Sequence, residues 1–546
     1  MPNDMPFLKK ISGKLSTRLP KKPHTWFKRM NPNDKAALES FSSRASSLRH
    51  ILRTNNPPSE HEFSVIRYLL QDVQEYVAVH DLHSEYRAYR PFHDLKLACQ
   101  SALSSLRRLP AEIISHIFSQ VVQDLFYFSD EGWMSLNTTK EPWTLAQISR
   151  SWRAVALGHQ EIWSYVKIDI KVLKMKRAPE PSLAALQCCL RRSGTHALSI
   201  YFKDSYPPVT PRVKELLCAL VPHSRQWKVV RFSISFEDLE LLMPVRGHLP
   251  SLHSLALLVY GFTTSGDVNI FEIAPQLREV SLEMYAPYTQ LLLPWPQLTT
   301  IFGWRARDMS FLRQATSLEG CSLTFYRSDT PSVLVPPIQM PLLRRLQLEL
   351  ECHLAGLTAP SLEDLNIHGI YMSPTLSLQH VTAFVRRSSC ALRSLLFRHI
   401  TIEGEFDIMP LLDSVPSLAF LQVKYGQVGW NKLFRVLTIT ETRRLVPNLK
   451  AIRFIFGFQL HTPPYLDPSI HPSLLLDMIE SRFYPDRTSG LESVALLEWK
   501  ESLPELCVGR LAKLEEQGLK VEDDARLGVE EDLPSVVDWA WDDVMD

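Results

Sequence analysis

The sequence predicts an α/β solenoid that follows a small all-helical module. Three observations predict it: a short apolar block recurs along the C-terminal part of the chain, apolar residues at helical spacing lie between its copies, and residues 109–163 carry two further helical stripes. The chain has 546 residues, more than one compact core usually takes, so we expect several domains or one long repeat array.

The recurring block has the form Leu-x-x-Leu-x-Leu and often follows a proline. Copies begin at Trp227, Leu252, Leu277, Leu298, Leu318, Leu343, Leu362, Leu392, Leu418, Leu449 and Leu491. Most starts lie about 19 to 31 residues apart, a period typical of leucine-rich repeats, which give one strand and a returning helix or loop per unit. Because alternate side chains of a strand face opposite ways, the leucines enter a shared core and the x positions line the concave face of a parallel sheet. The uneven period indicates an irregular solenoid over residues 180–505.

Helical spacing between the blocks supports this fold. Apolar residues recur at i, i+3, i+4 and i+7 in Val213, Leu216, Leu217 and Leu220. Leu474, Leu475, Met478 and Ile479 show the same helical spacing across the last turn of a second predicted helix. Such helices would cover the convex side of the sheet. The alternative is a set of unrelated αβ crossovers in a globular domain.

The x positions predict what the concave face binds. They carry charges of both signs, which favours a protein target over nucleic acid. Phe302 and Trp304 cluster on one predicted strand and are our predicted anchor for a target, with Arg345 and Glu349 further along. The alternative is that this strand is shifted by one residue, which would bury the two aromatic side chains.

Residues 109–163 begin with a predicted helix. Proline is tolerated in a first helical turn, and a negative charge suits the positive helix end, so Leu109-Pro110 and Glu112 mark a start. An apolar stripe follows in Ile113, Ile114, Ile117, Phe118 and Val121, and a second helix carries Leu145, Ile148, Trp152, Val155 and Ala156. The first stripe is wider than so small a core needs, so we expect part of it to face a partner.

This segment, residues 106–168, resembles an F-box, the helical module that docks on the Skp-type adaptor of cullin ubiquitin ligases. The resemblance implies adaptor contacts by Leu109, Pro110, Ile113, Ile114, Ile117 and Phe118, while Leu145, Ile148 and Trp152 would be part core and part contact. An insertion at residues 122–142 departs from the family pattern. It either extends a functional module or blocks docking, and a two-helix core segment without a partner is the further alternative.

Together with the repeats, the chain resembles the F-box/leucine-rich-repeat proteins of mushroom-forming fungi. Shared motifs are Trp143-Thr-Leu-Ala-Gln, Arg191-Arg-Ser-Gly, Leu293-Pro-Trp-Pro and Arg386-Arg-Ser-Ser. The resemblance implies a non-catalytic subunit that binds an adaptor and, through it, a cullin, while the repeats bind a target protein. The alternative is a repeat scaffold that enters no ligase. We find no nucleotide, zinc-protease or serine-hydrolase motif, and expect no cofactor or metal.

Charge and cysteine content give the remaining expectations. The net charge is +1, yet residues 1–56 carry 12 Lys/Arg against 3 Asp/Glu, and residues 515–546 carry 2 against 12. We expect a basic, largely disordered arm over 1–60, a helical lead-in over 61–105 and an acidic tail over 515–546. Eight cysteines without a C-x-x-C pair indicate reduced thiols in the cytoplasm or nucleus. No apolar run suits a membrane span or a secretory signal, so no membrane association is expected.

Overall fold

The computed structural model describes most of the chain. The described residues are 30–80, 89–128, 133–170, 183–204, 211–261, 268–284, 291–306, 309–325, 337–349, 351–368, 377–398, 408–424, 429–455, 470–483, 490–497 and 503–522. The chain divides into two compact units, Met1–Gln226 and Trp227–Asp546. The fold class is mixed α/β, with helices and parallel strands that recur along the sequence.

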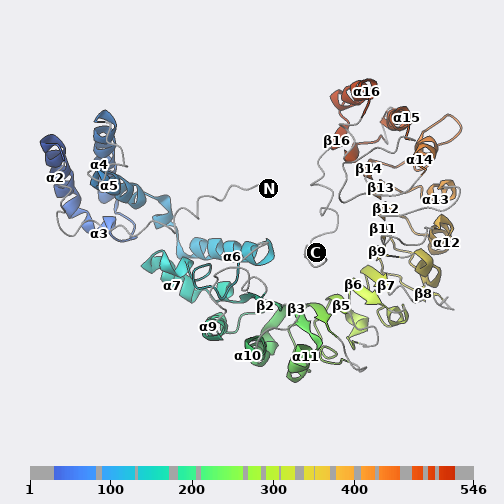
Figure 1. Ribbon diagram of the computed structural model, residues 1–546, viewed down its shortest axis with the longest axis horizontal. Helices are drawn as coiled ribbons and strands as arrows, with labels where there is room; N and C mark the ends of the chain where they lie inside the picture. The colour runs from blue at the N-terminus through green and yellow to red at the C-terminus, as the bar shows by residue number, and fades with distance from the viewer. Residues whose placement is uncertain are drawn as a thin grey trace. The chain divides into compact units, whose positions relative to one another are not determined.

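The first unit begins with a cluster of helices (Figure 1). They are α2 (Pro32–Ser47), α3 (Arg49–Leu52), α4 (Glu60–Val79) and α5 (Arg90–Ala102). A capping box of Ser59 and Glu62 starts α4, and the helices share a core whose members all lie between Met30 and Leu103. The predicted disordered arm is therefore wrong for residues 30–52, because their apolar side chains complete the core of α4 and α5. Residues 1–29 lie outside the described part.

The segment after this cluster is helical, as the spacing predicts. It contains α6 (Ala111–Phe128), η3 (Leu145–Gln147), α7 (Arg150–Gly158) and η4 (Gln160–Trp163), preceded by η2 (Ser105–Arg108). Helix α6 begins directly after Pro110, whose carbonyl accepts the Ile114 N–H at 3.1 Å. The predicted second helix is divided into η3 and α7, because the Ser149 side chain accepts the Trp152 N–H at 3.0 Å and caps a new helix start.

The first strands also lie in this unit. Strand β1 (Tyr165–Asp169) pairs in parallel with β2 (Leu198–Lys203). Between and after them lie α9 (Leu183–Ser193), α10 (Pro211–Leu220) and η5 (Val221–Gln226). The sheet therefore starts before residue 180, inside the segment expected to be wholly helical. The predicted helix around Leu216, Leu217 and Leu220 is confirmed, and all three side chains are buried.

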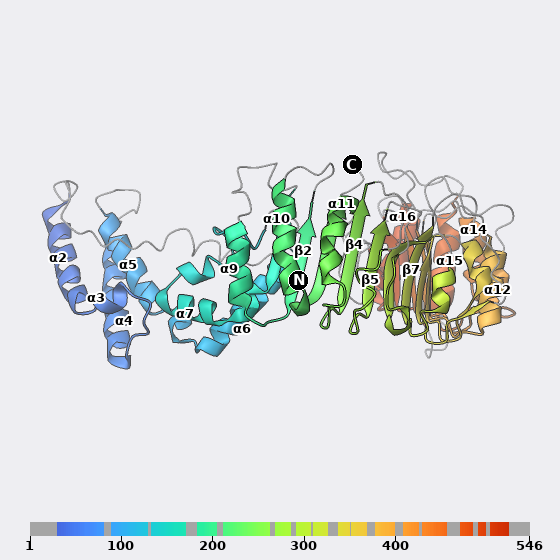
Figure 2. The same ribbon diagram turned by 90° about the horizontal axis from the view of Figure 1, so that it is seen from below.

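The second unit is built on a row of parallel strands that pair in chain order (Figure 2). They are β3 (Trp227–Ser235), β4 (Ser254–Tyr260), β5 (Glu279–Met284), β6 (Thr300–Ala306), β7 (Gly320–Phe325), β9 (Arg345–Leu348), β11 (Asp364–His368), β12 (Ser394–Arg398), β13 (Phe420–Lys424), β14 (Ala451–Ile455), β15 (Ser493–Leu497) and β16 (Lys520–Glu522). A strand lies in each of the eleven predicted blocks. Strands β8 (Ile338–Gln339) and β10 (Leu357–Thr358) form a separate pair.

Helices and short 3-10 turns connect these strands. They are α11 (Phe236–Leu239), η6 (Glu240–Val245), η7 (Trp295–Gln297), η8 (Ser310–Arg313), η9 (Glu351–Gly356), α12 (Leu378–Ser388), α13 (Met409–Asp413), α14 (Trp430–Leu437), α15 (Pro472–Phe483) and α16 (Glu505–Glu516). Within this unit, α12 to α15 lie on the outer side of the strands (Figure 1). Because α16 and β16 continue the pattern, the array does not end at 505, and residues 515–522 are not part of a tail.

The register explains why the leucines recur. One position of each strand pairs with the same position of the next, and the row is apolar and no more than 3% exposed: Leu255, Val280, Ile301, Cys321, Leu346, Leu365, Leu395, Leu421, Ile452 and Val494. At about 1.5–3 kcal/mol per buried side chain of this size, this row is a main source of stability. No repeat buries its row alone, so neighbouring repeats stabilise each other.

A backbone ladder joins neighbouring repeats just before their strands. The carbonyl of Arg344 accepts the N–H groups of Glu363 and Asp364, both at 2.9 Å, and the carbonyl of Glu363 accepts those of Arg393 and Ser394. The same paired contact recurs at the carbonyls of His253, Arg278, Thr299, Glu319, Arg393, Ala419 and Lys450. The strand entries are thereby held in register by main-chain atoms.

Arginines in the last turns of two outer helices reach back to the preceding repeat. Arg387 of α12 donates to the carbonyls of Leu354 and Leu357. Arg482 of α15 is only 2% exposed and donates to the carbonyls of Leu437, Leu445 and Val446. The guanidinium groups therefore satisfy turn carbonyls that the outer helices cover, which gives the Arg386-Arg-Ser-Ser motif a structural role.

Candidate partner-binding surfaces

The predicted adaptor-binding residues divide into an exposed and a buried set. Pro110 and Ile113 are exposed, the latter by 48%, whereas Leu109, Ile117, Ile148 and Trp152 are half-buried. Ile114, Phe118 and Leu145 are at most 5% exposed. Ile114 and Phe118 are therefore core residues, because α7 and η4 pack against α6, and Leu145 is a core residue of η3, which packs against α7.

The core beneath this surface is aromatic. Phe118 of α6 meets the ring of Trp152 at 5.1 Å between centroids, so the half-buried Trp152 connects the core to the surface. Trp163 is fully buried, and its Nε1 donates to the Ala156 carbonyl at 2.7 Å. The open apolar residues on α6 therefore rest on a segment with a core of its own.

The insertion at residues 122–142 is part of this core rather than a projecting loop. Residues 122–128 continue α6 and bury Val122 and Phe126. Residues 133–137 are buried against β1, where Ser135 N–H donates to the Lys167 carbonyl and Lys167 N–H donates to the Ser135 hydroxyl. Residues 129–132 lie outside the described part. Since Pro110 and Ile113 stay exposed, the described insertion does not cover the start of α6.

Cation–π contacts fix the end of the insertion. The Arg192 guanidinium lies 4.9 Å from the ring centroid of Trp143 and 4.3 Å from that of Trp163. The Trp143 Nε1 donates to the Ser135 carbonyl at 2.7 Å. The motifs Trp143-Thr-Leu-Ala-Gln and Arg191-Arg-Ser-Gly therefore meet in space and stabilise the same junction.

A serine, a histidine and a carboxylate meet between α6 and η4. Ser119 Oγ donates to Glu161 Oε2 at 2.5 Å and lies 2.7 Å from His159 Nε2. In a nucleophile relay the carboxylate holds the ring nitrogen opposite the one that contacts the serine. Here His159 Nε2 itself lies 3.5 Å from the same Glu161 oxygen, and Ser119 is 6% exposed. The three side chains therefore join α6 to the start of η4, and we call this contact the Ser119 latch.

We expect acid to weaken this latch. Burial lowers the pKa of His159 despite the raising effect of Glu161, so the folded chain binds this proton less readily than the unfolded chain, whose histidine has a pKa of about 6.5. The contribution of neutral His159 to the free energy of unfolding is therefore complete above about pH 6.5. It is lost as the pH falls through the lower pKa that this histidine has in the folded chain. Thermal unfolding midpoints measured between pH 7.5 and 5.5 should fall less steeply in His159→Gln than in the wild type. Burial also lowers the pKa of His223, so a matched His223→Gln variant distinguishes the effect of that histidine from the effect of His159. Equal slopes of the midpoint against pH in the wild type and in His159→Gln would contradict the prediction.

The inner face of the second unit is not equally open along its length. At β3 and β4 both faces are buried, including Arg231, Ala256 and Leu258. Partly exposed positions alternate with buried ones at β9, β11 and β12. Asn366 Nδ2 donates to Gln347 Oε1 across β11 and β9 at 3.1 Å. Beyond β4 the partly exposed positions include the polar Gln347 and Asn366 and the apolar Leu396, whereas Gln422 of β13 is buried again.

The predicted anchor at Phe302 and Trp304 is interrupted by a bulge. Ile301 pairs with Cys321, but Trp304 pairs with Leu323, so one extra residue lies between them in β6. Gly303 takes φ +59° there, a conformation that glycine adopts without steric cost. Register places position 304 beside the buried Leu323, so the two positions are not separated by the regular alternation of a strand, and the anchor stays a prediction. Phe302, Arg345 and Glu349 are half-buried, and the Trp304 side chain lies outside the described part.

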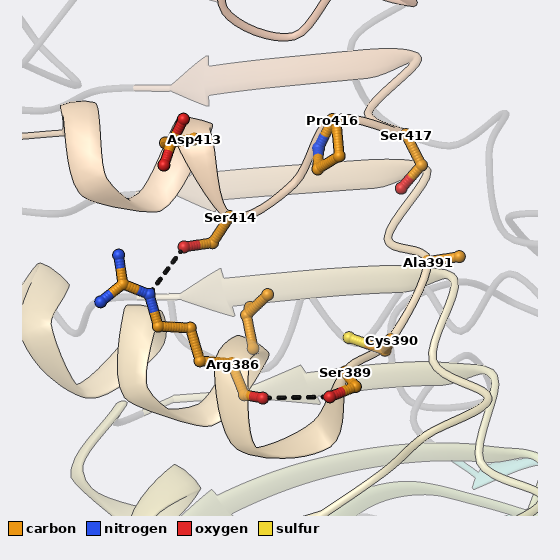
Figure 3. Close-up of a pocket in the computed structure, with 9 residues that line it drawn as sticks. Arg386, Ser389, Cys390, Ala391, Asp413, Ser414, Pro416 and Ser417 are labelled. Carbon is orange, nitrogen blue, oxygen red and sulfur yellow. Dashed lines mark hydrogen bonds between the residues drawn. The ribbon is translucent and has the colours of Figure 1, made fainter.

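A shallow pocket lies between α12 and α13 on the outer side (Figure 3). Its volume is about 590 Å³, and its lining includes Arg386, Ser389, Asp413 and Ser414. Arg386 Nε donates to Ser414 Oγ at 3.1 Å across the pocket, as Figure 3 shows. The pocket therefore lies at the junction of two neighbouring repeats, and the contact between Arg386 and Ser414 bridges it.

Comparisons with known proteins add no family. A scan of family models found no match, and a search of curated proteins found none either. Among the described residues, no helix is long and apolar enough to cross a membrane. The same residues contain no group of three or more His, Cys, Asp or Glu side chains arranged to hold a metal ion.

Proposed function

We propose that this chain is the substrate-recognition subunit of a Skp–cullin–F-box ubiquitin ligase. Residues 109–163 bind the Skp-type adaptor, and the open inner face of the second unit binds a target protein. The observation that carries the proposal is the apolar surface at the start of α6. Pro110 and Ile113 remain exposed although Phe118 and Trp163, in the core of the same segment, are fully buried.

The chain contributes proximity and carries out no chemistry itself. A target held on the inner face and an adaptor held on α6 bring the target near a separate ubiquitin-conjugating enzyme, which raises its effective concentration. The inner face is polar at Gln347 and Asn366 and carries the half-buried aromatic Phe302 on β6. Such a mixture of polar and aromatic groups is typical of surfaces that bind proteins.

The variant Leu109→Ala/Pro110→Ala is expected to lose adaptor binding by at least tenfold while the fold is retained. Both side chains lie at the start of α6, before the buried residues that hold α6 in place. Affinity purification of the tagged full chain from a eukaryotic lysate, followed by mass spectrometry, measures recovery of adaptor and cullin. Leu157→Ala, which removes a 43% exposed leucine from α7, is the matched control. Adaptor retained by the double variant contradicts the assigned surface.

A repeat scaffold outside any ligase is the second candidate function. It is favoured by the partly exposed inner face at β9, β11 and β12, which needs no adaptor to bind a protein. Wild-type chain that recovers neither adaptor nor cullin, but retains other proteins equally in both variants, supports the scaffold and contradicts the ligase proposal.

A further inference from the structure

Helix α6 carries a second apolar line that is less buried than the line facing the core. Its buried line runs through Ile114, Phe118, Val122 and Phe126. One residue earlier at each turn lie Ile113, Ile117, Val121 and Leu125. Together with Phe128, the last residue of the helix, they form what we call the α6 strip. Ile113 and Phe128 are 48% and 69% exposed, and the other three are half-buried. The strip runs from Ile113 to the end of the 18-residue helix at Phe128, about 23 Å at 1.5 Å per residue.

The charge beside the α6 strip is acidic. Helix α6 contains no Lys or Arg, and the next line of side chains, also four residues apart, is Glu112, His116, Gln120 and Asp124, all exposed. An occupant of the strip should therefore combine apolar residues spaced four apart with positive charge.

The N-terminal arm of the same chain has this pattern. Phe7, Ile11, Leu15 and Leu19 are spaced four apart, and Lys9, Lys10, Lys14 and Arg18 lie between them. Residues 1–29 together carry eight Lys/Arg and one Asp/Glu. The arm joins the described chain at Met30, which is buried in the helix cluster of the first unit. Eleven residues from Leu19 to Met30 extend at most about 40 Å.

We propose that residues 7–19 dock on the α6 strip and cover the surface that an adaptor would bind. Apolar side chains of the arm pack on the strip, and its lysines lie along Glu112 and Asp124. Attachment to the same chain gives the arm a high effective concentration, so even weak contacts compete with a free partner. Docking of the arm does not depend on the proposed function, whereas competition between the arm and the adaptor for the α6 strip rests on it.

The docking is tested with a fluorescein-labelled peptide of residues 1–29. The receiving protein is full-length chain with Ile11→Asp and Leu15→Asp, which frees the strip from its own arm. Fluorescence anisotropy should show binding, and affinity should fall at least tenfold when Ile113→Arg and Phe128→Arg are added. Tyr68→Arg, at a tyrosine 67% exposed on α4, is the matched control and should bind as before. Absence of binding, or equal loss with Tyr68→Arg, overturns the docking.

The competition is tested separately with the Skp-type adaptor. The full-length arm variant should capture at least several-fold more adaptor than the wild type. Equal capture overturns the competition but leaves the ligase proposal standing. If neither protein captures adaptor, the competition and the proposed function both fail, while the peptide result still decides whether the arm docks.

Discussion

Replacing Arg482 with methionine is expected to destabilise the last repeats of the second unit by about 3 kcal/mol or more. The guanidinium donates to three turn carbonyls, at 2.7 Å to Leu437, 3.0 Å to Leu445 and 3.2 Å to Val446. Burial lowers the pKa of Arg482 to about 10, so the group stays charged at neutral pH. Methionine fills similar space but leaves the three carbonyls without their donors, and each buried group left unsatisfied costs about 1–3 kcal/mol.

Hydrogen exchange of the full chain measures this effect locally, because a repeat array need not unfold in one step. Amides of β14 and α15 should exchange faster in Arg482→Met, whereas those of β4 and β5 should be unchanged. Arg387→Met is the matched control. It removes the equivalent contacts from α12, but Arg387 is exposed, so water replaces part of what is lost and we expect a smaller change. Unchanged protection of β14 in Arg482→Met would show that the carbonyls find other donors.

Replacing Trp163 with alanine is expected to cost about 3–5 kcal/mol in the first unit. The side chain is fully buried, its Nε1 donates to the Ala156 carbonyl, and its ring packs edge-on against Trp143 at 5.0 Å and faces Arg192. The change therefore removes the contact that joins α7, the insertion and α9. Adaptor binding should be lost as well, because α6 no longer rests on a formed core.

Comparison with Trp152 separates stability from binding. Trp152 is half-buried and belongs to the predicted contact set, so Trp152→Ala should lower the thermal midpoint less than Trp163→Ala while still weakening adaptor capture. Trp163→Phe keeps most of the packing but lacks the indole donor, and should lie between the wild type and the alanine variant. A thermal midpoint of Trp163→Ala equal to that of the wild type would contradict the assigned role.

The leucine period predicted the strands well because it reports on burial in neighbouring repeats. Leu346, Leu365 and Leu395 pair with one another across three strands, so their spacing in the sequence is the spacing of the repeat. The bulge at Gly303 has no such signal, since a single inserted residue changes the register only between its neighbours. The backbone register at position 304 therefore could not be predicted from the repeat pattern.

The helical segment shows a different limit. Apolar spacing on α6 predicted a helix, yet it does not say which apolar line is buried, because Ile113 and Ile114 are equally hydrophobic. The neighbouring elements decide this, and they place Ile114 and Phe118 inside. Local signals do mark the start of α2, namely the Asn31 N-cap and Pro32 in the first turn. The burial of this helix, however, depends on distant contacts, since Phe41 meets Tyr76 and Phe92.

The carbonyl ladder before the strands has a consequence for sequence change. The residues that supply these carbonyls include Arg344, Glu363, Ala419 and Lys450, so the contact places no demand on side-chain type. Substitutions along this rim can reverse its charge without disturbing the joints between repeats. The rim is therefore a place where surface charge can change at little cost in stability, and where sequences of similar architecture can drift apart.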